Sequence, residues 1–397
     1  MKALVNSVAV YFLFPICFAF ALLLVFFHVP DGFYLSLFAL LAVVVPVVLL
    51  FRVFVHLKLE LHKSFKLMTQ ERKNRFVVIV FCCAVFLSGP VDVYQNGFKL
   101  LDPASYAEFN GFGRYVRHIS SLCWTLVPIA FIFLSNTKHR LLLIGYALVF
   151  PIIIIDRNRL LASFFSLALC LVLESFLPMK NTVAPSKKGR IVILSLVMVL
   201  TFAGLGFFRS GEYAFIIESS GGELSGDALP LREIFYYLPS FLQQVVLYIT
   251  TPVFNFATIV HFDFRNEDFL FSQLAPFGRD MFDTYPYAPV MVPRFNVGTE
   301  FYPFLLYGGL PLVLASVIFM AFTFFLAGFL LKRYSNIFTF LIFLKIAHAV
   351  VFMGFAPQFY LLLNIGFVFM MLILWGFSSL LNSAKIIDEP VRKIELN

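Results

Sequence analysis

Long apolar stretches alternate with shorter polar segments along nearly the whole chain. A helix needs about 20 apolar residues to cross the hydrocarbon core of a bilayer. The pattern therefore predicts an all-α fold, a polytopic membrane helical bundle of about ten transmembrane helices. The predicted spans are 4–27, 33–51, 76–91, 118–135, 140–156, 160–178, 191–208, 302–331, 337–355 and 358–381.

The composition supports this class of protein. Hydrophobic residues make up 61% of the chain and charged residues 13%, with a mean hydropathy of +0.91, whereas soluble domains are about 45–50% apolar. A soluble globular fold is therefore excluded. The first span is too long for a signal-peptide core and lacks a small-residue cleavage site, so we expect it to remain as a signal anchor.

The positions of lysine and arginine predict which loops face the cytoplasm, because basic flanks are retained on that side. The basic residues lie mainly in alternate loops, at 52–75, 136–140, 179–190 and 332–336, and in the tail. We therefore expect residues 1–397 to form a single integral membrane domain with both termini cytoplasmic. Within it, 209–301 is a large external loop and 382–397 is a short cytoplasmic tail.

The segment 238–261 is nearly apolar enough to be an eleventh span. One further crossing would move Lys332 and Arg333 to the outside and invert everything after it. We therefore expect an amphipathic or re-entrant pair of helices, broken at Pro252 and lying on the outer face.

The net charge of +8 does not indicate a nucleic-acid partner, because the basic residues are spread over loops and form no separate basic domain. The five cysteines lie within apolar runs, and the histidines form no metal-ligand spacing. No nucleotide-binding or serine-hydrolase motif stands in a suitable context. We therefore expect no metal and no cofactor.

Arginines are the candidates for binding. The external loop carries five of them and no lysine: Arg209, Arg232, Arg265, Arg279 and Arg294. Arg157 and Arg159 lie in the tight external turn between the fifth and sixth spans. Because a guanidinium contacts phosphate oxygens in a planar, bidentate way, these residues could hold a phosphate or pyrophosphate at the membrane surface. The alternative for the turn is snorkelling to lipid headgroups, with Asp156 as the local counter-ion.

Acidic and aromatic residues accompany the arginines of the loop. Asp280 and Glu300 either form plain ion pairs with them or, like His261, act as a base for an acceptor hydroxyl. Tyr248 could stack on a sugar face, although aromatic residues are also common at membrane interfaces in general.

Three motifs resemble a known family. They are IDRNRLLASFFSLAL in the short external turn, LYITTPVFNFATIV in the large loop, and RFNVGTEFYPFLLYGGLPLV at the start of the next helix. The last motif contains Asn296, Gly298, Thr299, Pro303, Gly308 and Gly309. Together they resemble the Wzy-type polymerases of bacterial O-antigen and capsule repeat units over roughly residues 150–325. The chain departs from the family at Tyr307, where many relatives carry an acidic residue.

The resemblance implies a metal-independent glycosyltransferase of the GT-C class in the bacterial inner (cytoplasmic) membrane. It would transfer a glycan from an undecaprenyl diphosphate-linked donor to a carrier-linked acceptor at the periplasmic face, with a chain-length regulator protein as a further partner. Fixed arginines could neutralise the leaving diphosphate in place of a metal ion. The implied catalytic residues are Arg279, Arg294, Glu300, Asp280 and His261. The implied substrate-binding residues are Arg157, Arg159, Arg209, Arg265, Asn296, Thr299 and Tyr248.

Two alternatives stay open. An O-antigen ligase shares the architecture and the donor but transfers the glycan to lipid A core. A transporter or flippase of lipid-linked oligosaccharide would use Lys345 and His348, which share a face of the ninth span at a depth where ionisable groups are usually functional. An interior pairing that holds the bundle together explains the same two residues equally well.

Overall fold

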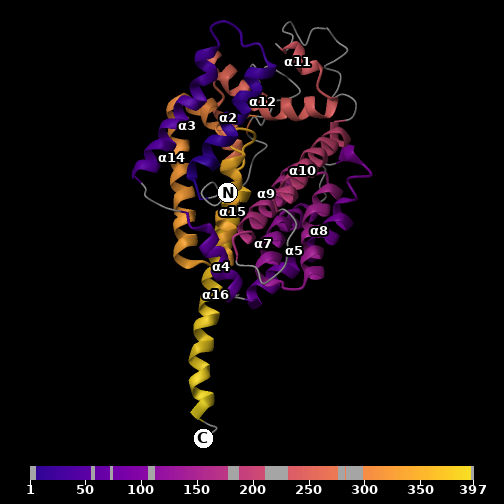
Figure 1. Cartoon of the computed structure of the whole chain (residues 1–397), viewed down its shortest axis with the longest axis vertical. Coiled ribbons are helices and arrows are strands. Elements are labelled where there is room, and N and C mark those ends of the chain that lie inside the picture. Colours follow the sequence, from indigo (N-terminus) through magenta and orange to yellow (C-terminus); the bar gives the residue numbers. More distant parts are fainter. Residues whose placement is uncertain are drawn as a thin grey trace. The chain divides into compact units, whose positions relative to one another are not determined.

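The computed structural model describes residues 6–54, 59–71, 75–105, 112–177, 187–210, 231–275, 282 and 298–394. All regular elements in these ranges are helices, and the one β-type pairing among them is an isolated bridge between Phe27 and Leu231. The all-α prediction is therefore confirmed (Figure 1). The helices are α2 (Val8–Phe26), α3 (Tyr34–Phe54), α4 (Leu61–Glu71), α5 (Arg75–Asn96), η1 (Pro103–Ser105), α6 (Gly113–Ser120), η2 (Cys123–Thr125), α7 (Leu126–Phe133), α8 (Thr137–Ile153), α9 (Arg157–Glu174), α10 (Lys187–Ser210), α11 (Glu233–Tyr236), α12 (Ser240–Phe262), α13 (Glu267–Leu274), α14 (Tyr302–Tyr334), α15 (Ile337–Val351) and α16 (Leu362–Ile394).

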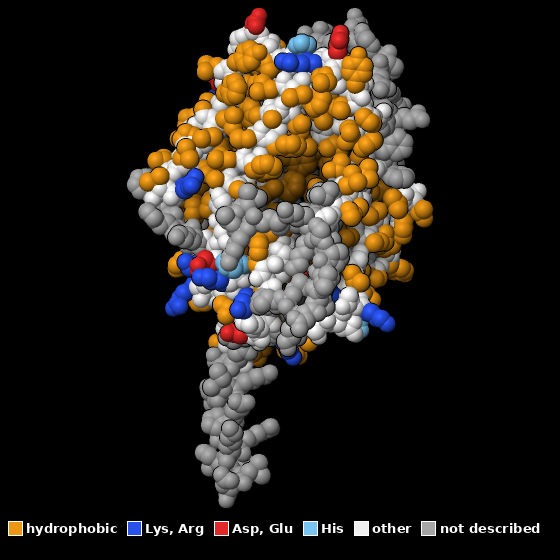
Figure 2. Space-filling view, viewed as in Figure 1, with side chains coloured by type: hydrophobic (Ala, Val, Ile, Leu, Met, Phe, Trp, Pro, Cys, Tyr) orange, Lys and Arg blue, Asp and Glu red, His pale blue; other side chains and the backbone are white. Residues whose placement is uncertain are grey.

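A helical segment lies over each of the ten predicted spans. Among the described residues, seven helical stretches are long and apolar enough to cross a membrane. Six of them coincide with predicted spans, and the seventh is α12. Hydrophobic side chains also cover much of the face drawn in Figure 2, with few charged side chains between them. The chain is thus built as a membrane protein, while ten crossings stay a prediction.

Helix α12 differs from its prediction. It is a single helix from Ser240 to Phe262, with Pro252 inside it, so the expected pair of helices broken at Pro252 is wrong. Proline removes one backbone donor but is tolerated inside apolar helices where the surrounding protein supports the helix. Here Thr251 to Ile259 are all buried. Figure 1 draws α12 across the view, whereas α14 runs along it.

The chain divides into two compact units. The first comprises Met1–Leu59, Ser195–Phe329 and Lys345–Ile365. Helix α12 packs on α2 and α3 in this unit. Aromatic side chains at the ends of those two helices contribute to the contact. Phe254 lies 5.6 Å from Phe27 and 5.2 Å from Phe33 between ring centroids. Stacked and tilted rings bury large apolar surfaces, which is the main source of stability for such contacts.

The second unit comprises Glu60–Leu194, Leu330–Leu344 and Gly366–Asn397. Within it α5 packs on α6, and α7, α8 and α9 pack on one another. Polar side chains join neighbouring helices here. The Tyr146 hydroxyl of α8 donates to the Phe86 carbonyl of α5 at 2.8 Å, and the Ser163 hydroxyl of α9 donates to the Ala147 carbonyl of α8 at 2.8 Å. Such bonds are a common way to join helices in an apolar setting.

Helix α14 of the first unit is interrupted at Gly308 and Gly309, which have non-helical backbone angles. Gly309 has φ 68° and ψ −161°, a region that is open almost only to glycine. A Cβ at this position would also lie 2.7 Å from Nη2 of Arg265. The backbone N–H of Asn266 donates to the Leu306 carbonyl at 3.0 Å, which ties the interruption to the segment before α13.

The substitution Gly309→Ala should destabilise the protein by about 1–3 kcal/mol, because the new Cβ strains the backbone at this angle and meets Arg265. Gly145→Ala in α8 is the control, since no atom lies within 4 Å of its added Cβ, and alanine is the better helix former. Thermal unfolding of both purified variants measures the difference. Equal melting temperatures for Gly309→Ala and the unchanged protein would contradict the expected strain.

Candidate functional site

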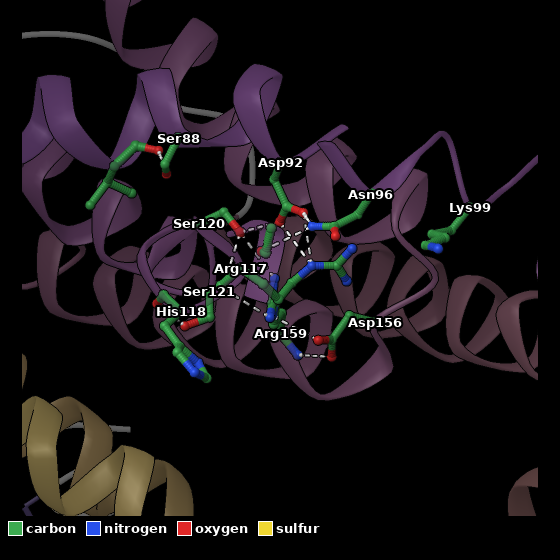
Figure 3. Close-up of polar contacts among 12 residues, drawn as sticks. Ser88, Asp92, Asn96, Lys99, Arg117, His118, Ser120, Ser121, Asp156 and Arg159 are labelled. Atoms are coloured by element: carbon green, nitrogen blue, oxygen red, sulfur yellow. Dashed lines mark hydrogen bonds and ion pairs between the residues drawn. The ribbon is translucent and has the colours of Figure 1, made fainter. Parts of the chain in front are cut away.

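A buried polar cluster lies in the second unit where α5, α6 and α9 meet (Figure 3). Asp92 comes from the end of α5, Arg117 and Ser120 from α6, and Arg159 from the first turn of α9. Asp92 and Ser120 are fully buried, and Arg117 is 7% exposed. A charge in an apolar interior costs several kcal/mol unless it is paired. The partners of Asp92 therefore decide how these helices pack.

Asp92 is satisfied from three directions. Nε of Arg117 lies 3.0 Å from Oδ1 and 2.9 Å from Oδ2. The amide of Asn96, one helical turn further along α5, donates to Oδ1 at 2.7 Å, and the Ser120 hydroxyl donates to Oδ2. Because these donors come from two helices, the carboxylate ties the end of α5 to α6.

Arg159 extends the cluster to α9. Its Nε pairs with Oδ2 of Asp156 at 2.7 Å, and its Nη1 and Nη2 approach the Ser120 hydroxyl at 3.4 Å and the Arg117 carbonyl at 3.3 Å. Asp156 also caps α9, because its Oδ1 accepts the backbone N–H of Arg159 at 3.1 Å. The turn before it places Ile155 at a φ of 53°. Asp156 thus fixes both the start of α9 and the position of the Arg159 side chain.

Close approach of α6 to α5 requires a glycine at position 113. A Cβ there would lie 2.2 Å from Oδ1 of Asn96. The Asn96 amide instead donates to the Gly113 carbonyl at 3.1 Å. A side chain at this position would displace the Asn96 amide, which also donates to Asp92.

Two further buried cations lie in neighbouring segments. Arg157, next to Asp156, is 8% exposed, and Lys99 is 4% exposed and donates to the Ser105 carbonyl at 2.7 Å. Within the cluster itself, Arg117 pairs with Asp92 and Arg159 with Asp156. The cluster thus gathers guanidinium groups, the side chains that bind phosphate in a planar, bidentate way.

A second buried charge lies in the first unit. Glu300 is 1% exposed, and its carboxylate accepts the backbone N–H groups of Gln358, Phe359 at 2.9 Å and Tyr360 at 3.1 Å. Burial raises the pKa of Glu300 to about 7, while the three N–H donors and the Lys345 charge oppose this rise. The structure thus brings the predicted Glu300 within electrostatic range of Lys345.

The other described candidates of the first unit make contacts of their own. Tyr248 packs 5.3 Å from both Phe202 and Phe355. His261 is exposed, with its ring 5.0 Å from that of Phe33. Thr299 is fully buried, Arg265 lies against Gly309, and Arg209 belongs to the last turn of α10. Four predicted residues lie outside the described part of the chain: Arg279, Asp280, Arg294 and Asn296.

Asp92, Arg117 and Ser120 are site residues that were not among the predicted ones. One signal was present, because Asp92 and Asn96 stand four residues apart near the end of an apolar helix, where an ionisable group needs a partner. The partner itself lies 25 residues further along the chain. Spacing does not reveal such a contact.

The chemistry open to this site is that of an anion-binding arginine cluster. In the described part of the chain, no group of three or more His, Cys, Asp or Glu side chains could hold a metal ion. Comparisons with protein-family models, curated proteins and solved structures find no match to this chain.

Replacing Asp92 with leucine should destabilise the protein by about 3–5 kcal/mol, because the Arg117 charge would stay buried without its carboxylate. The double variant Asp92→Leu, Arg117→Leu should recover most of that loss. Thermal unfolding of the single and double variants in detergent measures both effects.

Glu60→Ala is a matched control, since it removes a carboxylate whose partner, Lys63, has a side chain 62% exposed. We expect little change there, because exposed pairs are screened by solvent. A double variant less stable than Asp92→Leu would contradict the expectation, because it would show that the unpaired Arg117 charge does not cause the loss of stability.

Proposed function

We propose that the protein is a membrane glycosyltransferase that polymerises oligosaccharide repeat units linked to undecaprenyl diphosphate, of the O-antigen or capsule polymerase type. The observation that carries the proposal is the buried arginine cluster of α5, α6 and α9, in which Nη2 of Arg159 lies 3.3 Å from the Arg117 carbonyl. In the reaction, a hydroxyl oxygen of the acceptor sugar attacks the anomeric carbon of the donor glycan. The bond from that carbon to the carrier phosphate breaks, the carrier diphosphate leaves, and the hydroxyl proton passes to a base.

The diphosphate is the group that needs protein charge, because it gains negative charge as the bond breaks. Arg159 is suited to receive it. Its contacts to Ser120 and Arg117 are long, at 3.4 and 3.3 Å, and are made to neutral acceptors. A phosphate oxygen is a stronger acceptor for a guanidinium than a hydroxyl or a carbonyl. Asp156 would hold the side chain in place while its Nη groups turn to the ligand.

Helix α6 supports a site at the edge of the membrane. Arg117 and Ser120 point inward and are buried, whereas Phe112, Tyr115 and Ile119 are 69%, 65% and 46% exposed. Two polar side chains of α6 are thus packed against protein, while apolar side chains are presented outward beside the exposed His118. Such a helix fits beside lipid chains, including that of a polyprenyl carrier.

The remaining assignments of this proposal come from the sequence. Arg279 and Arg294 would close over the diphosphate, and His261, which is exposed, is a candidate for the base that takes the acceptor proton. Tyr248 would stack on a sugar ring. The carboxylate of Glu300 is held by backbone amides, which supports a holding role for this residue in place of the base role.

Arg159→Ala should abolish or strongly shorten the polymer, because the leaving diphosphate loses a bidentate partner, a change of about 100-fold or more in rate. Arg159→Lys should retain part of the activity, since it keeps the charge but not the planar fork. The measurement is a gel ladder of glycan lengths from a deletion strain that expresses each variant, with mass analysis of carrier-linked intermediates.

Arg140→Ala is the matched control at the other end of α9, where Arg140 pairs with Glu174 at 2.7 Å. It should leave the ladder unchanged at equal protein level. An unchanged ladder for Arg159→Ala would remove this residue from the mechanism. Accumulation of carrier-bound polymer, with none on lipid A core, would indicate the ligase reaction instead.

A further inference from the structure

Glu300 lies where two parts of the first unit meet. Its backbone N–H donates to the Met353 carbonyl at 2.7 Å, and its side chain reaches the amides of Gln358, Phe359 and Tyr360. It therefore binds both ends of the connection between α15 and α16. Three successive N–H groups that converge on one anion form a concave anion-binding site of backbone, which here is filled by a side chain of the same protein.

The connection that Glu300 holds carries aromatic residues of the unit. Phe355 packs against Tyr248 of α12 at 5.3 Å and against Phe202 of α10 at 6.1 Å. Tyr360 packs against Phe304 at 4.3 Å, and its hydroxyl donates to the Ser316 carbonyl of α14. Displacement of the connection would therefore disturb the packing around Tyr248.

We propose that Glu300 is a positioning residue, a carboxylate latch that fixes the α15–α16 connection and thereby holds Phe355 against Tyr248 as an aromatic wall for the sugar rings of the glycan. The sugar-binding part of this inference rests on the proposed function. The latch itself rests on the hydrogen bonds alone. Aromatic side chains suit sugars because the apolar face of the sugar stacks on the aromatic ring. The hydroxyls of the sugar stay free to form hydrogen bonds.

The latch is sensitive to protonation. Among the described residues, the titratable groups that interact with it are Lys345 of α15 and the Tyr360 phenol; His348, one turn further along α15, interacts with Lys345. Burial raises the pKa of Glu300 from 4.5 to about 7. Stability from the buried carboxyl is thus fully present below about 4.5 and is lost as the pH rises to about 7. The latch should open more often at the upper end of that range.

Hydrogen–deuterium exchange of the full-length protein in nanodiscs tests the latch without any activity assay. In Glu300→Ala the amides of residues 358–360 should exchange at least about tenfold faster, because all three lose their side-chain acceptor. In the unchanged protein, exchange corrected for its intrinsic pH dependence should accelerate between pH 4.5 and about 7. Glu300→Gln, a neutral isostere, should lose that dependence.

Glu267→Gln on α13 is the matched control, since this carboxylate is exposed, and it should leave the exchange of residues 358–360 unchanged. Unchanged exchange in Glu300→Ala would overturn the latch whatever the protein catalyses.

Polymerisation kinetics test the positioning role. Glu300→Ala should raise KM for the acceptor several-fold with a smaller effect on kcat, and Tyr248→Ala should do the same. Faster exchange with an unchanged KM would overturn the role in glycan binding. An unchanged protein that shows no polymerisation at all would overturn the proposed function, while the exchange data would still decide the latch.

Discussion

A charged side chain inside an apolar helical bundle has to find its partner within the protein, because no water is there to replace it. The chain meets this constraint in two ways. In the second unit, Asp92 is paired with an arginine and with two neutral donors. In the first unit, Glu300 is held by three backbone amides. Each arrangement joins segments far apart in sequence, so the buried charges fix how helix ends meet.

The two arrangements differ in what they leave for function. Both oxygens of Glu300 are used by amides, so the group is suited to hold backbone in place. The side chain of Arg159 is 13% exposed, pairs with Asp156 and makes two long contacts to neutral acceptors. A phosphate oxygen is a stronger acceptor than either of these neutral groups. This difference makes the second unit the candidate for an anionic ligand and the first unit the candidate for a glycan.

Hydropathy predicted the all-α membrane class and a helical segment over each expected span, because burial in lipid depends on local composition. The sequence also indicated Arg157 and Arg159 as candidates for binding, since two arginines in a short turn are unusual in an apolar chain. It did not predict that α12 continues through Pro252, because burial of the surrounding residues supports the helix. The partners of Asp92 on α6 and the side-chain partners of Glu300 could not be predicted, since they lie 25 or more residues away and, for Glu300, are backbone groups.

The most direct test asks on which side of the membrane the arginine cluster lies. Asn158→Cys and Lys138→Cys place single thiols at exposed positions near opposite ends of the α8–α9 hairpin, in a chain whose five natural cysteines are replaced with alanine. Intact spheroplasts are treated with a membrane-impermeant maleimide, and detergent-solubilised protein serves as the control in which both thiols react. The account predicts labelling at position 158 and none at position 138. Labelling at position 138, or none at position 158, would put the arginines on the cytoplasmic side and contradict it.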